Sequence, residues 1–462
     1  MDALILARLQ FAFTIAFHII FPAFTIGLAS YLAVLEGLWL TTRREAFQRL
    51  YLFWLKVFAL SFGMGVVSGV VMSYELGANW SVFSRAAAPV IGPLLGFEVL
   101  TAFFLEASFL GIMLFGWKKV GPGLHFTATV LVAIGTFISA FWILSANSWM
   151  QHPTGHAVLP DGSLIAVDWW KVVFSPTFPS RLAHMLLGAY LTTALVVGGA
   201  SAWRLMTAPT QPESRIALRM AIGMLAVVAP LQLVAGHISG EVVRHHQPLK
   251  LAAIEAYWET RADQPLSLFG LPDRKAGKTQ FEVAIPGAGA LAQGVSRETV
   301  LQGLDAWPRS DWPVVWLVYW GFRIMVGLGL AMIGLGLWGA FLVWRGGPER
   351  SRLYLWAATL MAPAGFVAVI AGWVVAEAGR QPWVIYGVLR TRDAVSPVGA
   401  GQVSASLLAF LIVYAIVFSA GALYILRLLH RGPEEAEQAP KPEDRAPGSA
   451  LAAPSEAGET PP

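Results

Sequence analysis

Nine long runs of apolar residues constrain this chain more than any other feature of its sequence. A helix needs about 20 mostly apolar residues to cross the hydrocarbon core of a bilayer, and every run meets that length. The runs lie near residues 9–40, 52–78, 93–117, 124–146, 182–203, 219–240, 313–344, 352–378 and 403–428. They predict an all-α integral membrane protein with about nine transmembrane helices in bundles. The first and seventh runs exceed the minimum and are expected to tilt or to project from the bilayer.

The composition is that of a chain surrounded mostly by lipid. Charged residues make up 13% of the sequence, whereas soluble proteins carry about 25%, and the mean hydropathy is +0.60. The absence of cysteine excludes disulfides, iron–sulfur clusters and thiolate metal sites, and leaves His, Met and Glu as metal ligands. The net charge of +4 is explained by basic cytoplasmic loops, so we expect no nucleic-acid partner.

The short connections between the runs predict the orientation of the chain. Lys and Arg concentrate in cytoplasmic loops, and here they follow the first, third, fifth, seventh and ninth runs. The N-terminus is therefore expected outside and the C-terminus inside. The basic residues concerned are Arg43, Arg44, Arg49, Lys118, Lys119, Arg204, Arg215, Arg219, Arg345, Arg350, Arg352, Arg427 and Arg431. The exterior connection 379–402 departs from the rule, because it holds Arg380, Arg390 and Arg392, which suggests another task for them.

The same pattern divides the chain into four parts. Residues 1–240 contain the first six transmembrane helices, and residues 313–431 contain helices seven to nine. Between them, residues 241–312 make one long hydrophilic segment on the outer side, which is long enough to be a binding loop. Residues 432–462 are rich in Pro, Ala and Glu and are predicted to form a disordered cytoplasmic tail.

Five possible metal ligands are expected at similar depth in the outer half of the membrane. They are His18, Glu98, His184, Met325 and Glu377, each on a different predicted helix. An ionisable side chain at the centre of a membrane helix costs about 2.5–3.5 kcal/mol or more, so such residues point to function. His and Met are usual ligands of haem iron, and cofactors of helix bundles lie in the bundle core. The alternatives are an interfacial histidine, a methionine that packs in the core and a glutamate that caps a helix.

Glu98 and Glu106 lie on the same predicted helix and indicate a path for protons. Their spacing of eight residues places them about 80° apart around a straight helix and about 12 Å apart along it. Two carboxylates that step inward along one broad face are typical of a proton relay, which Ser139 is a candidate to extend. The alternatives are a neutral, hydrogen-bonded Glu106 that ties helices together and a serine that only bridges helices.

The long outer segment contains a run, Gln247 to Glu255, in which charged residues flank apolar ones. Lys250 and Glu255 are therefore candidates to hydrogen-bond a quinol head group at the membrane surface. The alternative is a charged loop that is simply solvated.

Several of these residues stand in motifs of a known family. The chain resembles subunit I of the cytochrome bd quinol oxidases, of the type with a short quinone loop, from about Arg8 to Arg427. Two motifs are the most specific, Phe322 to Gly327 and the run from Gly372 and Trp373 through Glu377 to Trp383. Further segments that carry the resemblance are 8–12, which leads to His18, 96–98, 115–117, 142–144, 147–151 and 250–255.

The resemblance implies three haems and their ligands. In such an enzyme His184 and Met325 would ligate a low-spin haem b. His18 and Glu377 would be the axial ligands of haem d and of a high-spin haem b, and which of the two holds haem d stays open. Arg323 would lie beside the low-spin haem, and Trp373 and Arg380 would flank the haem cluster, which accounts for part of the arginine anomaly.

The resemblance also implies the reaction. The enzyme would oxidise quinol at the outer face and reduce dioxygen to water with protons from the cytoplasm, which generates a proton motive force without pumping. Glu98 would lie at the dioxygen-reducing site, and Glu106, with Ser139 close by, would lead protons inward. Gln247, Lys250 and Glu255 would bind quinol. The expected partners are subunit II and a small single-helix subunit, and the expected location is the bacterial cytoplasmic (inner) membrane.

Two positions depart from the pattern of this family. His237 stands where many relatives carry an acid, and Glu75 stands two residues away from the place where some relatives have one. No role is predicted for either residue.

Two rival functions use fewer of these residues. A quinol-linked, electron-carrying cytochrome b without oxygen reduction needs only the pair His184 and Met325. A haem-free transporter would move protons through Glu98 and Glu106, but it would predict inverted sequence repeats, and none is visible. The larger ligand set and the outer loop favour the oxidase.

Overall fold

A computed structural model describes residues 2–209 and 211–433. In this part of the chain nine helical spans are long and apolar enough to cross a membrane, which confirms the fold class predicted from the apolar runs. The spans are Ala3–Thr42, Glu45–Ala78, Ser81–Phe115, Pro122–Gln151, Trp169–Thr207, Pro212–His246, Val315–Trp344, Arg352–Ala378 and Ala400–Arg431. Most of the predicted tail, 434–462, lies outside the described residues.

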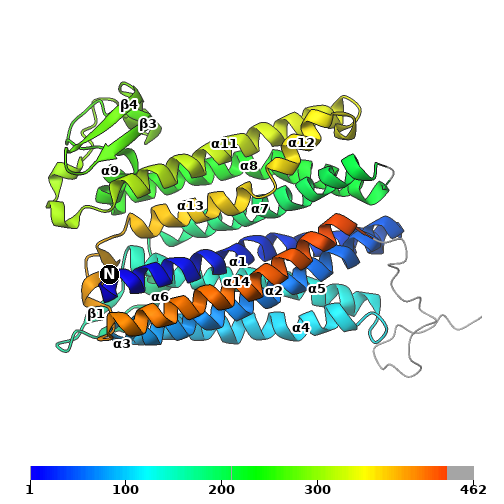
Figure 1. Ribbon diagram of the computed structural model, residues 1–462, viewed down its shortest axis with the longest axis horizontal. Helices are drawn as coiled ribbons and strands as arrows, with labels where there is room; N and C mark the ends of the chain where they lie inside the picture. Colours follow the sequence, from blue (N-terminus) through cyan, green and yellow to red (C-terminus); the bar gives the residue numbers. More distant parts are fainter. Residues whose placement is uncertain (1, 210, 434–462) are drawn as a thin grey trace, which may run out of the picture.

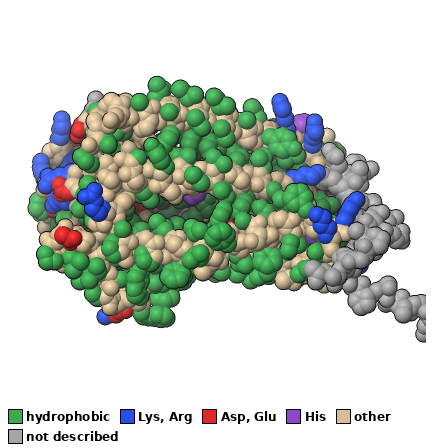
Figure 2. Space-filling model, turned by 90° about the horizontal axis from the view of Figure 1, so that it is seen from below, with side chains coloured by type: hydrophobic (Ala, Val, Ile, Leu, Met, Phe, Trp, Pro, Cys, Tyr) green, Lys and Arg blue, Asp and Glu red, His purple; other side chains and the backbone are tan. Residues whose placement is uncertain are grey.

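The spans run back and forth between two ends of one elongated bundle. The N-terminus and the folded segment after α8 lie at one end, and the last turn of α14 lies at the other (Figure 1). Lys and Arg gather at the two ends, whereas the middle of the face seen in Figure 2 is mostly apolar. This distribution is that of a multi-pass membrane protein, because charges avoid the hydrocarbon core. The basic loops predict that the α14 end is the cytoplasmic one.

The helices form two layers (Figure 1). One layer holds α7 (Phe178–Thr207), α8 (Pro212–His246), α11 (Val315–Trp344), α12 (Arg352–Leu360) and α13 (Ala364–Ala378). The other holds α1 (Ala3–Thr42), α2 (Glu45–Ala78), α3 (Ser81–Glu98), α4 (Phe104–Phe115), α5 (Pro122–Gln151) and α14 (Ala400–Arg431). A buried apolar cluster around Leu195 and Tyr354 lies within the first layer. A second cluster, around Tyr51 and Trp54, lies mostly in the other layer and extends to α7 and α8.

The two layers meet where α1 crosses α7. Thr193 of α7 donates a hydrogen bond to the backbone oxygen of Phe24 at 2.8 Å. A Cβ atom on Gly27 would lie only 2.5 Å from Thr193 Oγ1 and 2.8 Å from the carbonyl oxygen of Ala189. Only glycine therefore permits the two backbones to approach so closely, which is the usual device of membrane helix packing.

Two of the predicted spans are broken, and both breaks are near proline. A π-helical turn, Val99–Phe103, separates α3 from α4, and α3 contains Pro89 and Pro93. The span 352–378 consists of α12 and α13, which are separated at Pro363. Proline removes a helical hydrogen bond and crowds the preceding turn, and π-turns are frequent at functional sites.

The connections at the N-terminal end are folded. After α8 come α9 (Pro248–Glu255), the antiparallel pair β3 (Leu266–Asp273) and β4 (Lys278–Ile285), α10 (Ala288–Ala292) and the 3₁₀ turns Leu304–Ala306 and Arg309–Asp311. The other connections hold β1 (His156–Val158), β2 (Leu164–Ala166), α6 (Trp169–Val173), β5 (Trp383–Ile385), β6 (Leu389–Arg390) and the 3₁₀ turn Thr391–Asp393, and a 3₁₀ turn, Pro348–Arg350, precedes α12 at the opposite end. The predicted outer loop thus begins later than residue 241, since α8 continues to His246.

A larger side chain at Gly27 is expected to separate the two layers. We predict that Gly27→Val lowers the free energy of unfolding by about 1–3 kcal/mol, the usual cost of overpacking a close contact. The measurement is the thermal unfolding midpoint of the protein in detergent. Gly63→Val is the control, because no atom lies within 4 Å of a Cβ atom on Gly63. Equal midpoints for the two variants would contradict the prediction.

Candidate functional site

The charged residues of α9 point into the protein. Lys250 is 3% exposed and Glu255 is 2% exposed, so the alternative of a solvated charged loop is wrong. All residues of α9 from Leu249 to Glu255 are buried. Because burial of a charge is costly unless it is paired, the partners of these two residues define the site.

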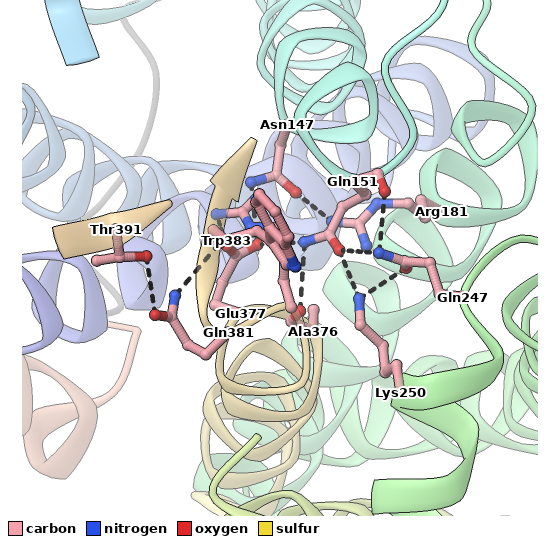
Figure 3. A network of polar contacts seen from close by, with 11 residues as sticks. Asn147, Gln151, Arg181, Gln247, Lys250, Ala376, Glu377, Gln381, Trp383 and Thr391 are labelled. Atoms are coloured by element: carbon pink, nitrogen blue, oxygen red, sulfur yellow. Dashed lines mark hydrogen bonds and ion pairs between the residues drawn. The ribbon is translucent and has the colours of Figure 1, made fainter. Parts of the chain in front are cut away.

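Glu377, at the end of α13, is the centre of a polar network (Figure 3). Its carboxylate forms an ion pair with Arg380, one turn later. Oε1 accepts hydrogen bonds from Asn147 Nδ2 and from Gln151 Nε2, each at 3.0 Å. Glu377 is thus tied to α5 by side chains, and the alternative of a solvated helix cap does not hold.

Lys250 enters the same network from α9 (Figure 3). Its Nζ donates to Gln151 Oε1 at 2.5 Å and to Gln247 Oε1 at 2.8 Å. Gln247 Nε2 in turn donates to the backbone oxygen of Gln151 at 2.9 Å. Burial lowers the pKa of Lys250 well below its ordinary value. Gln151 therefore connects the outer segment to Glu377, because it is hydrogen-bonded both to Lys250 and to the carboxylate of Glu377.

Arg181 completes the network and was not among the residues selected from the sequence. Its guanidinium donates to Asn147 Oδ1, and it lies on α7, three residues before His184. The apolar run predicted for this helix begins at 182, so Arg181 counted as part of a connection, whereas α7 begins at Phe178. A search for charged residues within one turn of each predicted span would have found it.

The network carries more positive than negative charge. Three cationic side chains, Arg181, Lys250 and Arg380, surround one carboxylate, Glu377, and an uncharged Lys250 would still leave one positive charge in excess. Within the described residues, Nε of Arg181 and both Nε and Nη1 of Arg380 are buried and have no hydrogen-bond partner. Buried guanidinium groups with free N–H donors fit carboxylates, and the propionate groups of a haem are such carboxylates.

Glu255 belongs to a second cluster, around Arg323 of α11. Arg323 Nη2 contacts Glu255 Oε2 at 3.2 Å and donates to the backbone oxygen of Ser267 at 2.6 Å, while Nη1 donates to the backbone oxygen of Ile254 at 2.8 Å. Its guanidinium carbon lies 3.3 Å from the ring centroid of Tyr319. Burial raises the pKa of Glu255, and the nearby Arg323 opposes that rise only in part. Arg323 thus joins α11 to the outer segment.

His184 and Met325 each face a glycine on a neighbouring helix. A Cβ atom on Gly236 of α8 would lie 3.4 Å from His184 Cε1, and one on Gly372 of α13 would lie 2.7 Å from Met325 Sδ. Gln232 of α8 donates to the His184 ring, at 3.1 Å from Nε2. Only small residues permit these close approaches, and His and Met are both usual ligands of haem iron, so the chemistry of this pair fits a haem.

His18 has a similar environment in the other layer. Its Nδ1 lies 2.9 Å from Ser68 Oγ, and a Cβ atom on Gly69 would lie 3.3 Å from its Cε1. A hydrogen bond at one ring nitrogen leaves the other free for a metal and fixes the ring. Trp373 of α13 packs near Phe11 of α1, with ring centroids 6.5 Å apart. The face in Figure 2 is hollowed midway along the bundle, with a histidine inside the hollow.

Glu98 and Glu106 face the same side of α5. Ser139 Oγ donates to Glu98 Oε1 at 2.8 Å, so Ser139 lies beside Glu98 rather than Glu106. A Cβ atom on Gly135, four residues earlier, would lie 2.6 Å from Glu106 Cγ. The π-turn between the two acids explains their alignment. It accommodates one extra residue, so the acids lie about 20° apart around the helix rather than about 80°.

Glu106 keeps one oxygen without a partner. Its side chain is buried, and Oε1 accepts no hydrogen bond from the described residues. A carboxyl that only tied helices together would use its oxygens for that purpose. The free oxygen is therefore available to a water molecule or a proton.

Comparison with known proteins places this geometry in a family. A family profile described as cytochrome bd terminal oxidase subunit I matches residues 6–433. The chain belongs to the cytochrome bd terminal oxidase subunit I family. It is therefore a subunit of a terminal oxidase, a family of haem enzymes. This result supports the oxidase predicted from the sequence over the alternative of a simple electron-carrying cytochrome b.

Individual relatives are similar over nearly their whole length. Cytochrome bd ubiquinol oxidase subunit 1 of Bacillus subtilis (strain 168) is 33% identical, with 94% of this chain and 95% of the relative covered. Cytochrome bd-II ubiquinol oxidase subunit 1 of Escherichia coli (strain K12) is 31% identical, with 94% and 97% covered. The solved bd oxidase of Geobacillus thermodenitrificans superposes with a TM-score of 0.86 at 27% identity, over 94% of this chain and 99% of that one.

The contact at Gly135 gives a test of the position of Glu106. We predict that Gly135→Val displaces Glu106 and lowers oxygen consumption about 10²-fold or more, as does Glu106→Gln, because a positioned proton donor contributes about 10²–10⁴-fold. Oxygen consumption and haem content are measured on the purified complex. Gly111→Val on α4, where no atom lies within 4 Å of a Cβ atom, is the control. Normal turnover of Gly135→Val would show that the contact with Glu106 is irrelevant.

Proposed function

We propose that this chain is the haem-bearing subunit of a bacterial quinol oxidase that works without pumping. Quinol is oxidised at the end of the bundle that carries α9, and dioxygen is reduced to water with protons from the opposite end. The observation that carries the proposal is the buried network of Figure 3, in which one chain of hydrogen bonds joins Lys250 of the outer segment to Glu377. A haem-free transporter would not need this hydrogen-bonded connection between the outer segment and a candidate iron ligand.

Four residues are proposed to hold two haem b groups and one haem d. His184 and Met325 would hold the low-spin haem b, and His18 and Glu377 would hold haem d and the high-spin haem b. Bound haem supplies the electron transfer and the dioxygen chemistry. The protein supplies the fixed ligands, and Arg181 and Arg380 supply the positive charge that propionates need, with Trp373 as an apolar wall.

The carboxyl groups of the α3–α4 span are proposed to deliver protons. Glu106 takes a proton from the cytoplasmic end and passes it toward Glu98, which Ser139 holds by a hydrogen bond at 2.8 Å. With the extra residue of the π-turn absorbed, the acids lie about 10–11 Å apart along the axis, so the transfer needs ordered water between them. Because both protons of quinol leave at the other end, charge crosses the membrane as dioxygen is reduced.

The outer segment is proposed to bind the quinol head group at α9. Gln247 and Lys250 are hydrogen-bond partners for one quinol oxygen, and Glu255 accepts a proton from the other. A proton acceptor works best when its pKa lies near the working pH, and burial raises the pKa of Glu255 in that direction. The ion pair of Glu255 with Arg323, two residues before Met325, brings the acceptor close to the proposed low-spin haem.

The proposed oxidase is a complex in the bacterial cytoplasmic membrane. Subunit II and a small single-helix subunit are the expected partners, and quinol and dioxygen are the substrates. The nine spans found among the described residues and the relatives' names, which include a putative menaquinol oxidase of Bacillus subtilis, support this assignment.

A reduced-minus-oxidised absorption spectrum of the purified complex tests the proposal. We expect bands of haem b together with a red-shifted band of haem d, and we expect Met325→Leu to abolish or convert the low-spin signal, because leucine has no sulfur ligand. Met332→Leu, at a buried position on the same helix, is the control, since such swaps cost less than about 1.5 kcal/mol. A low-spin spectrum unchanged in Met325→Leu would remove Met325 from the ligand set.

The quinol site has its own test. We expect Glu255→Gln to lower the rate of quinol oxidation about 10²-fold or more, because the amide cannot accept the proton, and to leave oxidation of an artificial electron donor nearly intact. The control in the same segment is Glu282→Gln, on an exposed position of β4. Equal losses with the two donors would count against a quinol role for Glu255.

A further inference from the structure

Glu75 of α2 is a buried acid that the proposed mechanism does not use. Its side chain is fully buried, at 0% exposure, within a span that crosses the membrane. A carboxyl in this position is costly unless it is neutral or compensated. Glu75 therefore needs either a partner that compensates its charge or a bound proton that neutralises it.

One contact of Glu75 is with α1, close to His18. Thr14 Oγ1 of α1 lies 2.5 Å from Glu75 Oε2, and Thr14 is one helical turn, about 6 Å along the axis, before His18. Glu75 does not touch His18 itself. The second oxygen, Oε1, completes no hydrogen bond. Asn79, which caps the C-terminal end of α2, turns its amide toward Glu75, and its Nδ2 is also unpaired.

No Lys, Arg or His among the described residues forms an ion pair with Glu75. The other titratable group that faces it is Tyr414 of α14, which is 2% exposed and has an unpaired hydroxyl. Neither Thr14, Asn79 nor Tyr414 can carry positive charge. A negative Glu75 therefore depends on a positive charge that the described residues do not provide, and the metal centre proposed at His18 is a candidate for it.

Polar groups continue from Glu75 toward the N-terminal end of the bundle. Toward the N-terminal end, the backbone oxygen of Asn79 accepts from the amide of Ser396 at 2.8 Å, and Ser396 Oγ contacts Ser81 Oγ at 2.7 Å. These polar groups lie where α2, α3 and the segment before α14 meet. Toward the other end, Phe21, Met64 and Phe418 pack around Tyr414, and its hydroxyl is the one polar group of this cluster.

We propose that Glu75 binds a proton from the N-terminal end of the bundle when the centre held by His18 is reduced and releases it when that centre is oxidised. One electron added to the centre removes one positive charge, and one proton on the Glu75 carboxylate restores the balance; only an O–H bond forms or breaks. The electron comes from the oxidase's own donor and the proton from water. The inference rests on the proposed role of His18.

A redox titration of the haems at several pH values tests this coupling in the purified complex. In the wild-type protein the midpoint potential of one haem is expected to fall with pH, by up to about 59 mV per unit for one proton and one electron. In Glu75→Gln the slope of that haem is expected to flatten, while the other haems keep theirs. Glu36→Gln is the matched control, because Glu36 is equally buried but pairs with His125 at 2.6 Å. Identical slopes in wild type and Glu75→Gln would overturn the inference.

Infrared difference spectroscopy gives a readout that does not depend on a folded variant. Reduction of the wild-type protein is expected to add a band of a protonated carboxyl, and Glu75→Gln to lose it. Absence of any such band in wild type would overturn the inference by itself. A His18→Ala variant separates the two proposals. If His18→Ala loses one haem while Glu75→Gln keeps the wild-type slopes, His18 remains a ligand and only the role of Glu75 is rejected. If His18→Ala retains all haems, both proposals are rejected.

Discussion

The structure depends on one constraint, that charges within the membrane must find their partners inside the protein. Glu377 meets it with Arg380, Asn147 and Gln151, and Glu255 meets it with Arg323. These contacts hold α5, α9, α11 and α13 together at one end of the bundle. The loop connections there are folded for the same reason, because α9 must be held against the membrane helices to bury Lys250 and Glu255. Arg181, Arg380 and Glu75 keep polar atoms without a partner among the described residues, and these atoms are the ones that a cofactor or a proton would pair with.

Much of the fold could be predicted because lipid imposes a simple rule on sequence. An apolar run of about 20 residues has few alternatives to a transmembrane helix, and all nine predicted runs are helical spans in the structure. The breaks at Val99–Phe103 and near Pro363 were not predicted, because hydropathy carries no information about hydrogen-bond register. The folded connections were missed too, since short strands such as β5 and β6 have no period long enough to recognise.

The site could be predicted in its residue types but not in its contacts. His18, His184 and Glu377 stand out because ionisable side chains are rare within a membrane helix. Met325 was selected because methionine is a usual ligand of haem iron. One sequence does not show which helices are neighbours, so it could not show that Ser139 lies beside Glu98, that Gln151 links Lys250 to Glu377, or that Arg181 joins them. Glu75 was passed over because the family resemblance offered no role for an acid at that position.

The short helix α9 has a consequence for the whole enzyme. Its first turn is bonded to the network of Glu377 and its last residue is bonded to Arg323, so a ligand that binds α9 acts on both clusters at once. Binding linkage is reciprocal. If the bound ligand changes the midpoint potential of a redox centre beside either cluster, reduction of that centre must change the affinity for the ligand by the equivalent free energy. If α9 binds quinol as proposed, the affinity of this segment for its substrate therefore depends on whether the neighbouring redox centre is reduced or oxidised.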